Sequence, residues 1–227
     1  TESGDMLVSD NGNHKIKKVT TAGVVTTFAG TGINGSNNGP ALSATFKQTA
    51  GMAIDSQGNV FVVETDDHSI RKITPSGEVS LFAGGQNGMN DGNGTNARFT
   101  FPQGIAVDAA NNLYVTDGAN HLIRKITPNA DVTTIAGSSL GFADGQGAAA
   151  QFNFPTGIVV DKQGDIYVVD KSNHSIRKIS SDGSVTTIAG GGTTDDFDSP
   201  YGITIDALGD LYVADQSKHR IRKITQE

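Results

Sequence analysis

The sequence predicts an all-β fold, a β-propeller in which four-stranded antiparallel sheets (blades) repeat around a common axis. Three observations predict it: a motif returns at a near-constant interval, the segments around it have the composition of strands, and those segments are apolar on both faces. An interval of this size is typical of repeat architectures, in which each unit is one supersecondary element. The 227 residues are expected to form a single domain, 1–227, that starts and ends in mid-repeat.

The repeated motif has the form x-His-x-Ile-(Arg/Lys)-Lys-(Ile/Val) and contains all five histidines of the chain. Successive histidines are 54, 53, 53 and 45 residues apart. The five copies of the motif are Asn13–Val19, Asp67–Ile73, Asn120–Ile126, Asn173–Ile179 and Lys218–Ile224.

Each repeat contains four short segments that are expected to be strands. In the third repeat they are Gly104–Asp108, Leu113–Asp117, the motif itself and Val132–Ala136. They are rich in Val, Ile, Thr and Tyr and are bounded by Gly, Asn and Asp, as strands are. Turn sequences such as Asp55–Asn59 separate the segments, because Asp can close an Asx-turn and Gly tolerates a positive φ. Each repeat is therefore predicted to be a four-stranded antiparallel meander.

The segments are apolar at both even and odd positions, as in Val60–Val63. In a sheet with one face exposed to solvent, apolar and polar residues would alternate along each strand. Both faces of these sheets must therefore be covered by other parts of the protein. Sheets stacked face to face around a ring form a propeller. The first repeat lacks its first segment and the last repeat lacks its fourth, which leaves 18 predicted strands. The fold is thus either five-bladed or a fragment of a six-bladed ring.

Composition excludes several classes of function. The net charge of −7 argues against general affinity for nucleic acid or anionic membranes, and no apolar run is long enough for a membrane span. There is no cysteine, hence no disulfide and no thiol chemistry. We expect no cofactor, no nucleic acid partner and no insertion into a membrane.

The second strand, the turn and the motif together resemble the NHL repeat, named for Asn-His-Leu, and Asn120-His121-Leu122 matches that triplet. The resemblance covers nearly the whole chain because all five copies share it. The long version, with a repeat of 53 residues, is similar to NHL propellers of bacterial surface proteins. The resemblance therefore implies a propeller fold, a binding or scaffold role and an extracellular or periplasmic location.

Long links join the fourth strand of one repeat to the first strand of the next. The link Gly137–Pro155 contains Asp144-Gly145 and the run Ala148–Phe152. We expect the alanines to form one helical turn and Phe152 to anchor the link into the rim of the propeller. The link Gly190–Pro200 is eight residues shorter and carries Asp195, Asp196 and Asp198 instead.

Two sets of residues, the motif histidines and the motif arginines, are better explained by a structural role than by metal binding or catalysis. The histidines occupy equivalent positions in different blades, so they cannot converge on a zinc ion. The NHL family includes an α-amidating lyase with histidine-bound zinc, but this chain has no histidine outside the motif. The motif arginines are expected to pair with repeated carboxylates or backbone carbonyls; they are Arg71, Arg124, Arg177 and Arg222. No catalytic residue and no metal ligand is predicted.

These observations favour a non-catalytic binding or scaffold module that contacts a protein, a carbohydrate or a small ligand through its loop face. Two alternatives remain open at this stage. One is a propeller hydrolase or lyase with a metal at the central channel, and the other is an excised or engineered fragment with no activity of its own. Unpaired edge strands also predict self-association.

The residue between Pro and Gly at the start of each first strand is predicted to stand at the mouth of the central channel. These residues differ between repeats while their neighbours recur. They can therefore form a ligand site without disturbing the propeller fold. The predicted ligand-binding residues are Gln103, Thr156 and Tyr201, with Ala50 in the copy that lacks Pro. Arg98, Asp144 and the loop Asp195–Asp198 are expected to rim the same site.

Overall fold

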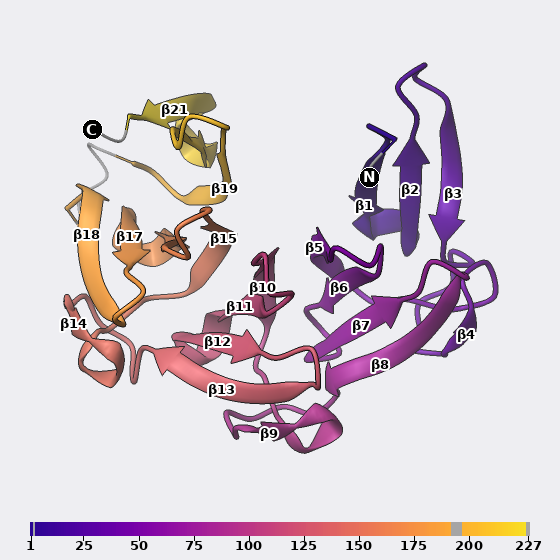
Figure 1. Cartoon of the computed structure of the whole chain (residues 1–227), viewed down its shortest axis with the longest axis horizontal. Coiled ribbons are helices and arrows are strands. Elements are labelled where there is room, and N and C mark those ends of the chain that lie inside the picture. The colour runs from indigo at the N-terminus through magenta and orange to yellow at the C-terminus, as the bar shows by residue number, and fades with distance from the viewer. Residues whose placement is uncertain (2, 192–196, 226–227) are drawn as a thin grey trace.

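The computed structural model describes residues 1, 3–191 and 197–225. Five antiparallel sheets follow one another around a common centre and form a five-bladed β-propeller (Figure 1). The sheets that contain the two termini lie on either side of an opening in the ring (Figure 1). The predicted all-β propeller is confirmed.

The described strands follow the repeat. The first sheet contains β1 (Met6–Asp10), β2 (Lys15–Val19) and β3 (Val25–Ala29). The second contains β4 (Gly39–Pro40), β5 (Thr49–Ile54), β6 (Val60–Glu64), β7 (Ser69–Ile73) and β8 (Glu78–Gly84). The third contains β9 (Gly92–Asn93), β10 (Pro102–Val107), β11 (Leu113–Asp117), β12 (Leu122–Ile126) and β13 (Asp131–Ala136). The fourth contains β14 (Gly145–Gln146), β15 (Pro155–Val160), β16 (Ile166–Asp170), β17 (Ser175–Ile179) and β18 (Ser184–Gly190). The fifth contains β19 (Pro200–Ile205), β20 (Leu211–Asp215) and β21 (Arg220–Ile224).

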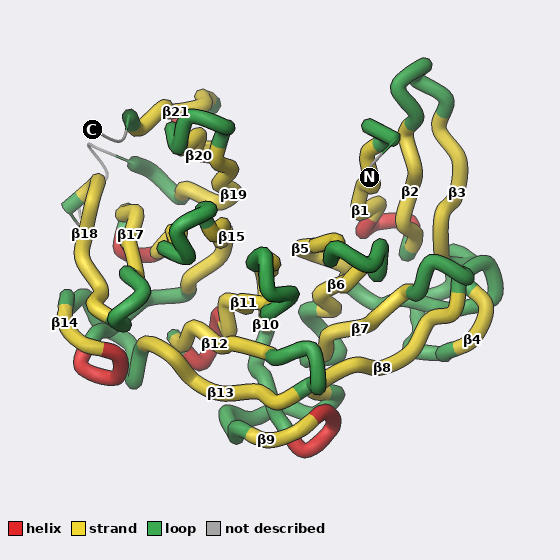
Figure 2. Tube along the Cα trace, viewed as in Figure 1, coloured by secondary structure: helices red, strands yellow, loops and turns green. Residues whose placement is uncertain are grey.

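Short 3₁₀-helices connect some of these strands (Figure 2). They are η1 (Asn11–Asn13), η2 (Gly94–Asn96), η3 (Gly118–Asn120), η4 (Gly147–Ala149), η5 (Lys171–Asn173) and η6 (Gln216–Lys218). In the described part of the chain, no helix is long and apolar enough to cross a membrane.

The middle strands are covered on both faces, as their composition predicted. Every residue of β6, β11 and β16 is buried. The apolar clusters lie between neighbouring sheets, so that Phe61 of the second sheet packs with Leu113 of the third. By contrast, β1 and β21 at the two ends of the arc contain no fully buried residue.

The structure contains all 18 predicted strands and adds three that the sequence did not indicate. These three, β4, β9 and β14, are two residues long and come from the links. Each pairs with the outermost strand of its sheet, as β14 pairs with β18. A strand of two residues shows no period-2 alternation, which is why pattern reasoning missed it.

The link that precedes the fourth sheet turns back toward the core immediately after β14. The alanine run forms the single helical turn η4, and Ala150 and Phe152 that follow it are fully buried. Phe152 packs in one cluster with Ile123 of the third sheet and Val168 of the fourth. The predicted anchor is confirmed, and its position between two sheets explains why it must be a large apolar side chain.

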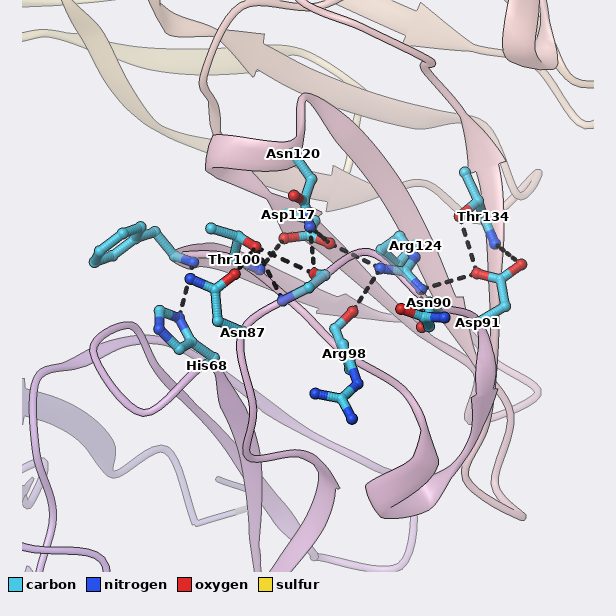
Figure 3. A network of polar contacts seen from close by, with 12 residues as sticks. His68, Asn87, Asn90, Asp91, Arg98, Thr100, Asp117, Asn120, Arg124 and Thr134 are labelled. Carbon is cyan, nitrogen blue, oxygen red and sulfur yellow. Dashed lines mark hydrogen bonds and ion pairs between the residues drawn. The ribbon is translucent and has the colours of Figure 1, made fainter.

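An arginine clip holds the links that precede the second, third and fourth sheets in place. In the third sheet Arg124 donates to Asp117 Oδ2 at 2.8 Å and to Asp91 Oδ1 at 2.8 Å (Figure 3). It also donates to the backbone carbonyls of Arg98 and Asn90, both at 3.0 Å. Because Asp91, Arg98 and Asn90 all belong to the link, one guanidinium ties the link to the blade.

The clip recurs in the neighbouring sheets. Arg71 pairs with Glu64 and Arg177 pairs with Asp170, each at 2.8 Å with both side chains buried. Arg222 lies 3.6 Å from Asp215 and is more exposed. The prediction that these arginines bind carboxylates or carbonyls is confirmed.

Burial raises the pKa of Asp117 above its ordinary value, against the lowering effects of Asn120, the Thr100 N–H and Arg124. The carboxylate therefore depends on its donors to remain charged in the core. Arg124 also lies over the Phe99 ring, with its guanidinium carbon 5.1 Å from the ring centroid. This contact adds cation–π attraction between the clip and the apolar anchor.

Arg124→Ala should lower the free energy of unfolding by about 3–5 kcal/mol, because Asp117 then loses its partner in the core. Lys17→Ala is the matched control. Lys17 occupies the same motif position in the first sheet, is half-buried and bonds Thr27 Oγ1 at 3.1 Å. Its loss should cost no more than about 1 kcal/mol. Urea denaturation measures both, and equal losses would contradict a special role for the buried pair.

Candidate functional site

Four inner strands, β5, β10, β15 and β19, pack against one another in succession around the centre of the arc. Their first residues surround a cavity of about 470 Å³. Its wall includes Ala50, Gln103, Thr156 and Tyr201 from these strands and Asn11 and Thr65 from the ends of neighbouring second strands.

The Pro-x-Gly sequence positions these residues. In the pairing of β10 with β11 the register shifts between Pro102 and Ile105, which leaves Gln103 and Gly104 outside the regular ladder. A Cβ on Gly104 would lie 2.2 Å from the carbonyl oxygen of Thr156 on the next inner strand. Glycine is therefore required at this close approach, whereas the residue before it is not fixed by backbone geometry.

Threonine hydroxyls join neighbouring sheets beneath the mouth. Thr116 Oγ1 donates to the Thr156 carbonyl at 2.6 Å, and Thr156 Oγ1 donates to the Tyr201 carbonyl at 2.9 Å. Thr65 Oγ1, at a different position of the repeat, donates to the Pro102 carbonyl at 2.9 Å. Since its hydroxyl is already engaged and its side chain is buried, Thr156 shapes the cavity more than it offers a group to a ligand.

Tyr201 and Gln103 are two of the accessible polar residues of the wall, together with Asn11 and Gln48. The Tyr201 hydroxyl donates to Gln103 Oε1 at 3.1 Å, which links the fifth sheet to the third across the mouth. Burial raises the pKa of Tyr201, so the phenol stays protonated at neutral pH and remains a donor. Lys171 Nζ lies 5.1 Å from the centroid of the Tyr201 ring.

The cavity wall combines uncharged polar side chains with apolar ones such as Met52 and Ile105. The lining residues in the described part of the chain include no Asp, Glu, Lys, Arg or His. Amides, hydroxyls and backbone groups therefore supply its hydrogen-bonding capacity.

The motif histidines connect blades instead of forming a site. His68 Nδ1 accepts from the Phe101 N–H at 3.2 Å, and His121 Nδ1 accepts from the Phe154 N–H at 3.1 Å. Burial lowers the pKa of His121, which favours the neutral ring that can accept. Among the described residues, no three His, Cys, Asp or Glu side chains are placed to hold a metal ion together.

Comparison with known proteins agrees with this architecture. The family profile described as NHL repeat matches residues 99–126, 152–179 and 197–224, each of which runs from the anchor phenylalanine to the end of the motif. The chain belongs to the NHL-repeat β-propeller family.

Two relatives illustrate the range of this NHL family. The protein SUPPRESSOR OF QUENCHING 1, chloroplastic, of Arabidopsis thaliana is 30% identical over 183 residues, which are 74% of this chain and 17% of that protein. NHL repeat-containing protein 2 of Homo sapiens is 28% identical over 200 residues, 80% of this chain and 28% of that protein. The chain thus spans less than a third of the length of either relative.

A solved propeller has the same fold. The virginiamycin B lyase of Staphylococcus aureus superimposes with a TM-score of 0.67 and 20% identity, over 100% of this chain and 65% of the lyase. At this level of identity the similarity establishes the fold alone.

The predicted site residues of the NHL propeller fall into three groups. Gln103, Thr156, Tyr201 and Ala50 line one cavity. The two rim residues are not among its lining residues: Asp144 binds Arg177, and the backbone of Arg98 binds Arg124. Asp195 and Asp196 lie outside the described residues, and the N–H of Asp198 donates to Asp215.

Sequence reasoning missed the residues that follow the acid at the end of each second strand. Asn11 and Thr65 line the cavity, and Lys171 lies beside Tyr201. A signal was available, because this position varies between repeats while the acid before it recurs. The equivalents are Asn11, Thr65, Gly118, Lys171 and Gln216.

His121→Ala should destabilise the NHL propeller by about 1 kcal/mol more than His219→Ala, because only His121 binds a following blade. Both histidines have a left-handed backbone, with φ of 60° and 51°, so the cost of placing alanine there cancels in the comparison. Chemical denaturation of the two variants checks this. Equal losses would mean that the bond from Phe154 contributes nothing.

Asp144→Asn should flatten the dependence of stability on pH in the acid range. Burial acts to raise the pKa of Asp144, but hydrogen bonds from Thr187 and Arg177 outweigh it and hold the pKa below its ordinary value. The stability that this carboxylate contributes is therefore present above its unfolded pKa of about 4 and is lost as pH falls through the folded pKa. Thermal melting between about pH 5 and pH 2, the titration range of a carboxylate, should show a smaller decline of the melting temperature in the variant than in the wild type. An unchanged decline would contradict the assignment.

Proposed function

We propose that this NHL propeller is a non-catalytic binding module whose mouth holds an uncharged polar ligand, such as a neutral carbohydrate. The observation that carries the proposal is the cavity of about 470 Å³ whose described wall offers amides, hydroxyls and one tyrosine ring without a charged side chain. A cavity of this size lies within the usual range for small-ligand sites.

The chemistry of the mouth favours a neutral partner. A charged ligand would lose its hydration without meeting a compensating charge, and that loss is costly. A neutral hydroxylated ligand can instead exchange hydrogen bonds with the Gln103 amide and the Tyr201 hydroxyl. The Tyr201 side chain is 42% exposed, so an apolar ligand face can also lie against its ring.

An acid–base enzyme is the competing class. General acid–base catalysis needs a titratable group within hydrogen-bond reach of the substrate. Tyr201 is the one described lining residue with a titratable side chain, and its raised pKa makes it a poor base at neutral pH. These features support binding over proton transfer at this mouth.

A panel of uncharged and charged disaccharides, tested by calorimetric titration, examines the proposal. At least one uncharged member should bind, and Gln103→Ala should weaken it by about tenfold, the effect of roughly one hydrogen bond and its desolvation. Gln163→Ala is the matched control, since Gln163 lies in a turn that lines a different surface hollow. Binding only of charged members, or a loss confined to Gln163→Ala, would contradict the proposed site.

A further inference from the structure

A hollow of about 310 Å³ lies between the third and fourth sheets, and it shares no lining residue with the cavity at the channel mouth. The third sheet contributes aromatic, cationic and aliphatic side chains to its wall. The fourth sheet contributes apolar residues and the turn that follows β17. These wall residues include Tyr114, Lys125 and Ile135 from the third sheet and Ile166, Ser180 and Asp182 from the fourth.

Lys125 is the lysine that directly follows the clip arginine in the motif. In the first, fourth and fifth sheets, the lysine at this position binds an aspartate that stands immediately before the second strand of the repeat. The three pairs, with the distance from Nζ to Oδ2, are Lys18–Asp5 at 2.8 Å, Lys178–Asp165 at 2.6 Å and Lys223–Asp210 at 2.6 Å.

The third sheet lacks this aspartate. Asn112 stands in its place, and the Asn112 amide donates to Asp108 Oδ2 at 2.8 Å. Lys125 is half-buried, and in the described part of the chain no carboxylate lies within ion-pair distance of its Nζ. The ammonium lies instead over the Tyr114 ring, 5.9 Å from the ring centroid.

The second sheet also has asparagine at this place, but its lysine is held in another way. Lys72 Nζ lies 5.8 Å from the centroid of the Phe61 ring and 6.0 Å from that of Phe82, and both rings attract the cation. Ile135 occupies the position of Phe82 in the third sheet. Lys125 therefore has neither the aspartate nor the second ring that its equivalents have.

The two acids around the hollow have donors of their own. Asp108 accepts the Tyr114 hydroxyl at 3.0 Å in addition to the Asn112 amide. Asp182 is exposed, and its Oδ1 accepts the Ser184 N–H at 2.9 Å. The ammonium of Lys125 is thus left facing the hollow without a counterion from the described chain.

We propose that this hollow binds a small monocarboxylate with an apolar body, such as an aromatic acid. The carboxylate of the ligand takes the place that an aspartate occupies beside the equivalent lysines, in a charge-assisted hydrogen bond with Lys125. The apolar body packs against Tyr114, Ile135 and Ile166. The Ser180 hydroxyl, which makes no hydrogen bond with a described residue, donates to the second carboxylate oxygen.

Size and charge restrict the ligand further. A volume of about 310 Å³ is at the lower end of small-ligand sites, which favours a single ring or a short chain. Asp182 on the wall repels a second negative charge, so a monoanion fits better than a phosphate dianion. This site is independent of the ligand proposed at the channel mouth.

Titration of the isotopically labelled whole chain with benzoate, followed by NMR, tests the proposal. The backbone signals of Lys125 and of the turn at Ser180 should shift saturably, with a Kd of about 1 mM or lower, as for a fragment that makes one charge-assisted bond. Benzamide has nearly the same shape and no charge, so it should bind at least about tenfold more weakly. Phenyl phosphate should bind no more tightly than benzoate.

Two pairs of variants locate the site. Lys125→Met removes the charge, keeps an unbranched side chain and should weaken benzoate binding at least about tenfold, whereas Lys125→Arg should retain binding. Lys72→Met is the matched control, because Lys72 has the same place in the motif but does not line the hollow.

Asn112→Asp supplies from within the chain the carboxylate that three other sheets have. It should pair with Lys125 and abolish benzoate binding. Asn59→Asp makes the same change in the second sheet and should leave the affinity for benzoate unchanged. Thermal melting of each variant separates loss of the site from loss of the fold.

The proposal is overturned if benzoate causes no saturable shift, or if benzamide binds as tightly as benzoate. Undiminished affinity in Lys125→Met or in Asn112→Asp, with an unchanged melting temperature, would also contradict it. A short peptide with one glutamate among glycines provides the last arm. Tighter binding of this peptide than of benzoate would identify an acidic side chain of a polypeptide as the occupant and would overturn the proposed small acid.

Discussion

The buried arginine–carboxylate pair is the interaction on which the architecture depends. The side chains of Arg124 and Asp117 are both fully buried and 2.8 Å apart, although removing two charges from water costs several kcal/mol per ion. The cost is offset because one guanidinium also binds three groups of the link and lies over an anchor phenylalanine. The Arg124 Nε nevertheless has no hydrogen-bond partner among the described residues. A buried donor without a partner lowers the stability of the fold.

The task of the clip explains why arginine recurs at this position of the motif. Arginine occupies this motif position in the second to fifth sheets, and Lys17 occupies it in the first sheet. Lysine is a point charge that cannot hold several acceptors in a plane, whereas the arginine fork can. The clip is therefore matched to its task of fixing a link of about 19 residues, which would otherwise be long for an ordered connection.

Two contacts between blades recur: the anchor phenylalanine packs against the motif isoleucine, and the motif histidine accepts a backbone N–H of the next blade. These contacts use the backbone or residues that repeat, so the positions between them are free to differ. Gln103, Thr156 and Tyr201 occupy such positions, which is why a cavity wall can be specific within a regular scaffold.

The sequence by itself determined the strands, the repeat, the anchor phenylalanines and the residues nearest the channel. These follow from local rules, because side-chain period, turn chemistry and the Pro-x-Gly pattern act within one repeat. Only the tertiary structure decided that the Tyr201 hydroxyl binds Gln103, 98 residues away, that the Thr156 hydroxyl is already engaged, and that Asp144 binds Arg177 and does not line the cavity. These outcomes depend on the rotation between successive blades, which brings together groups from different repeats and which no local pattern encodes.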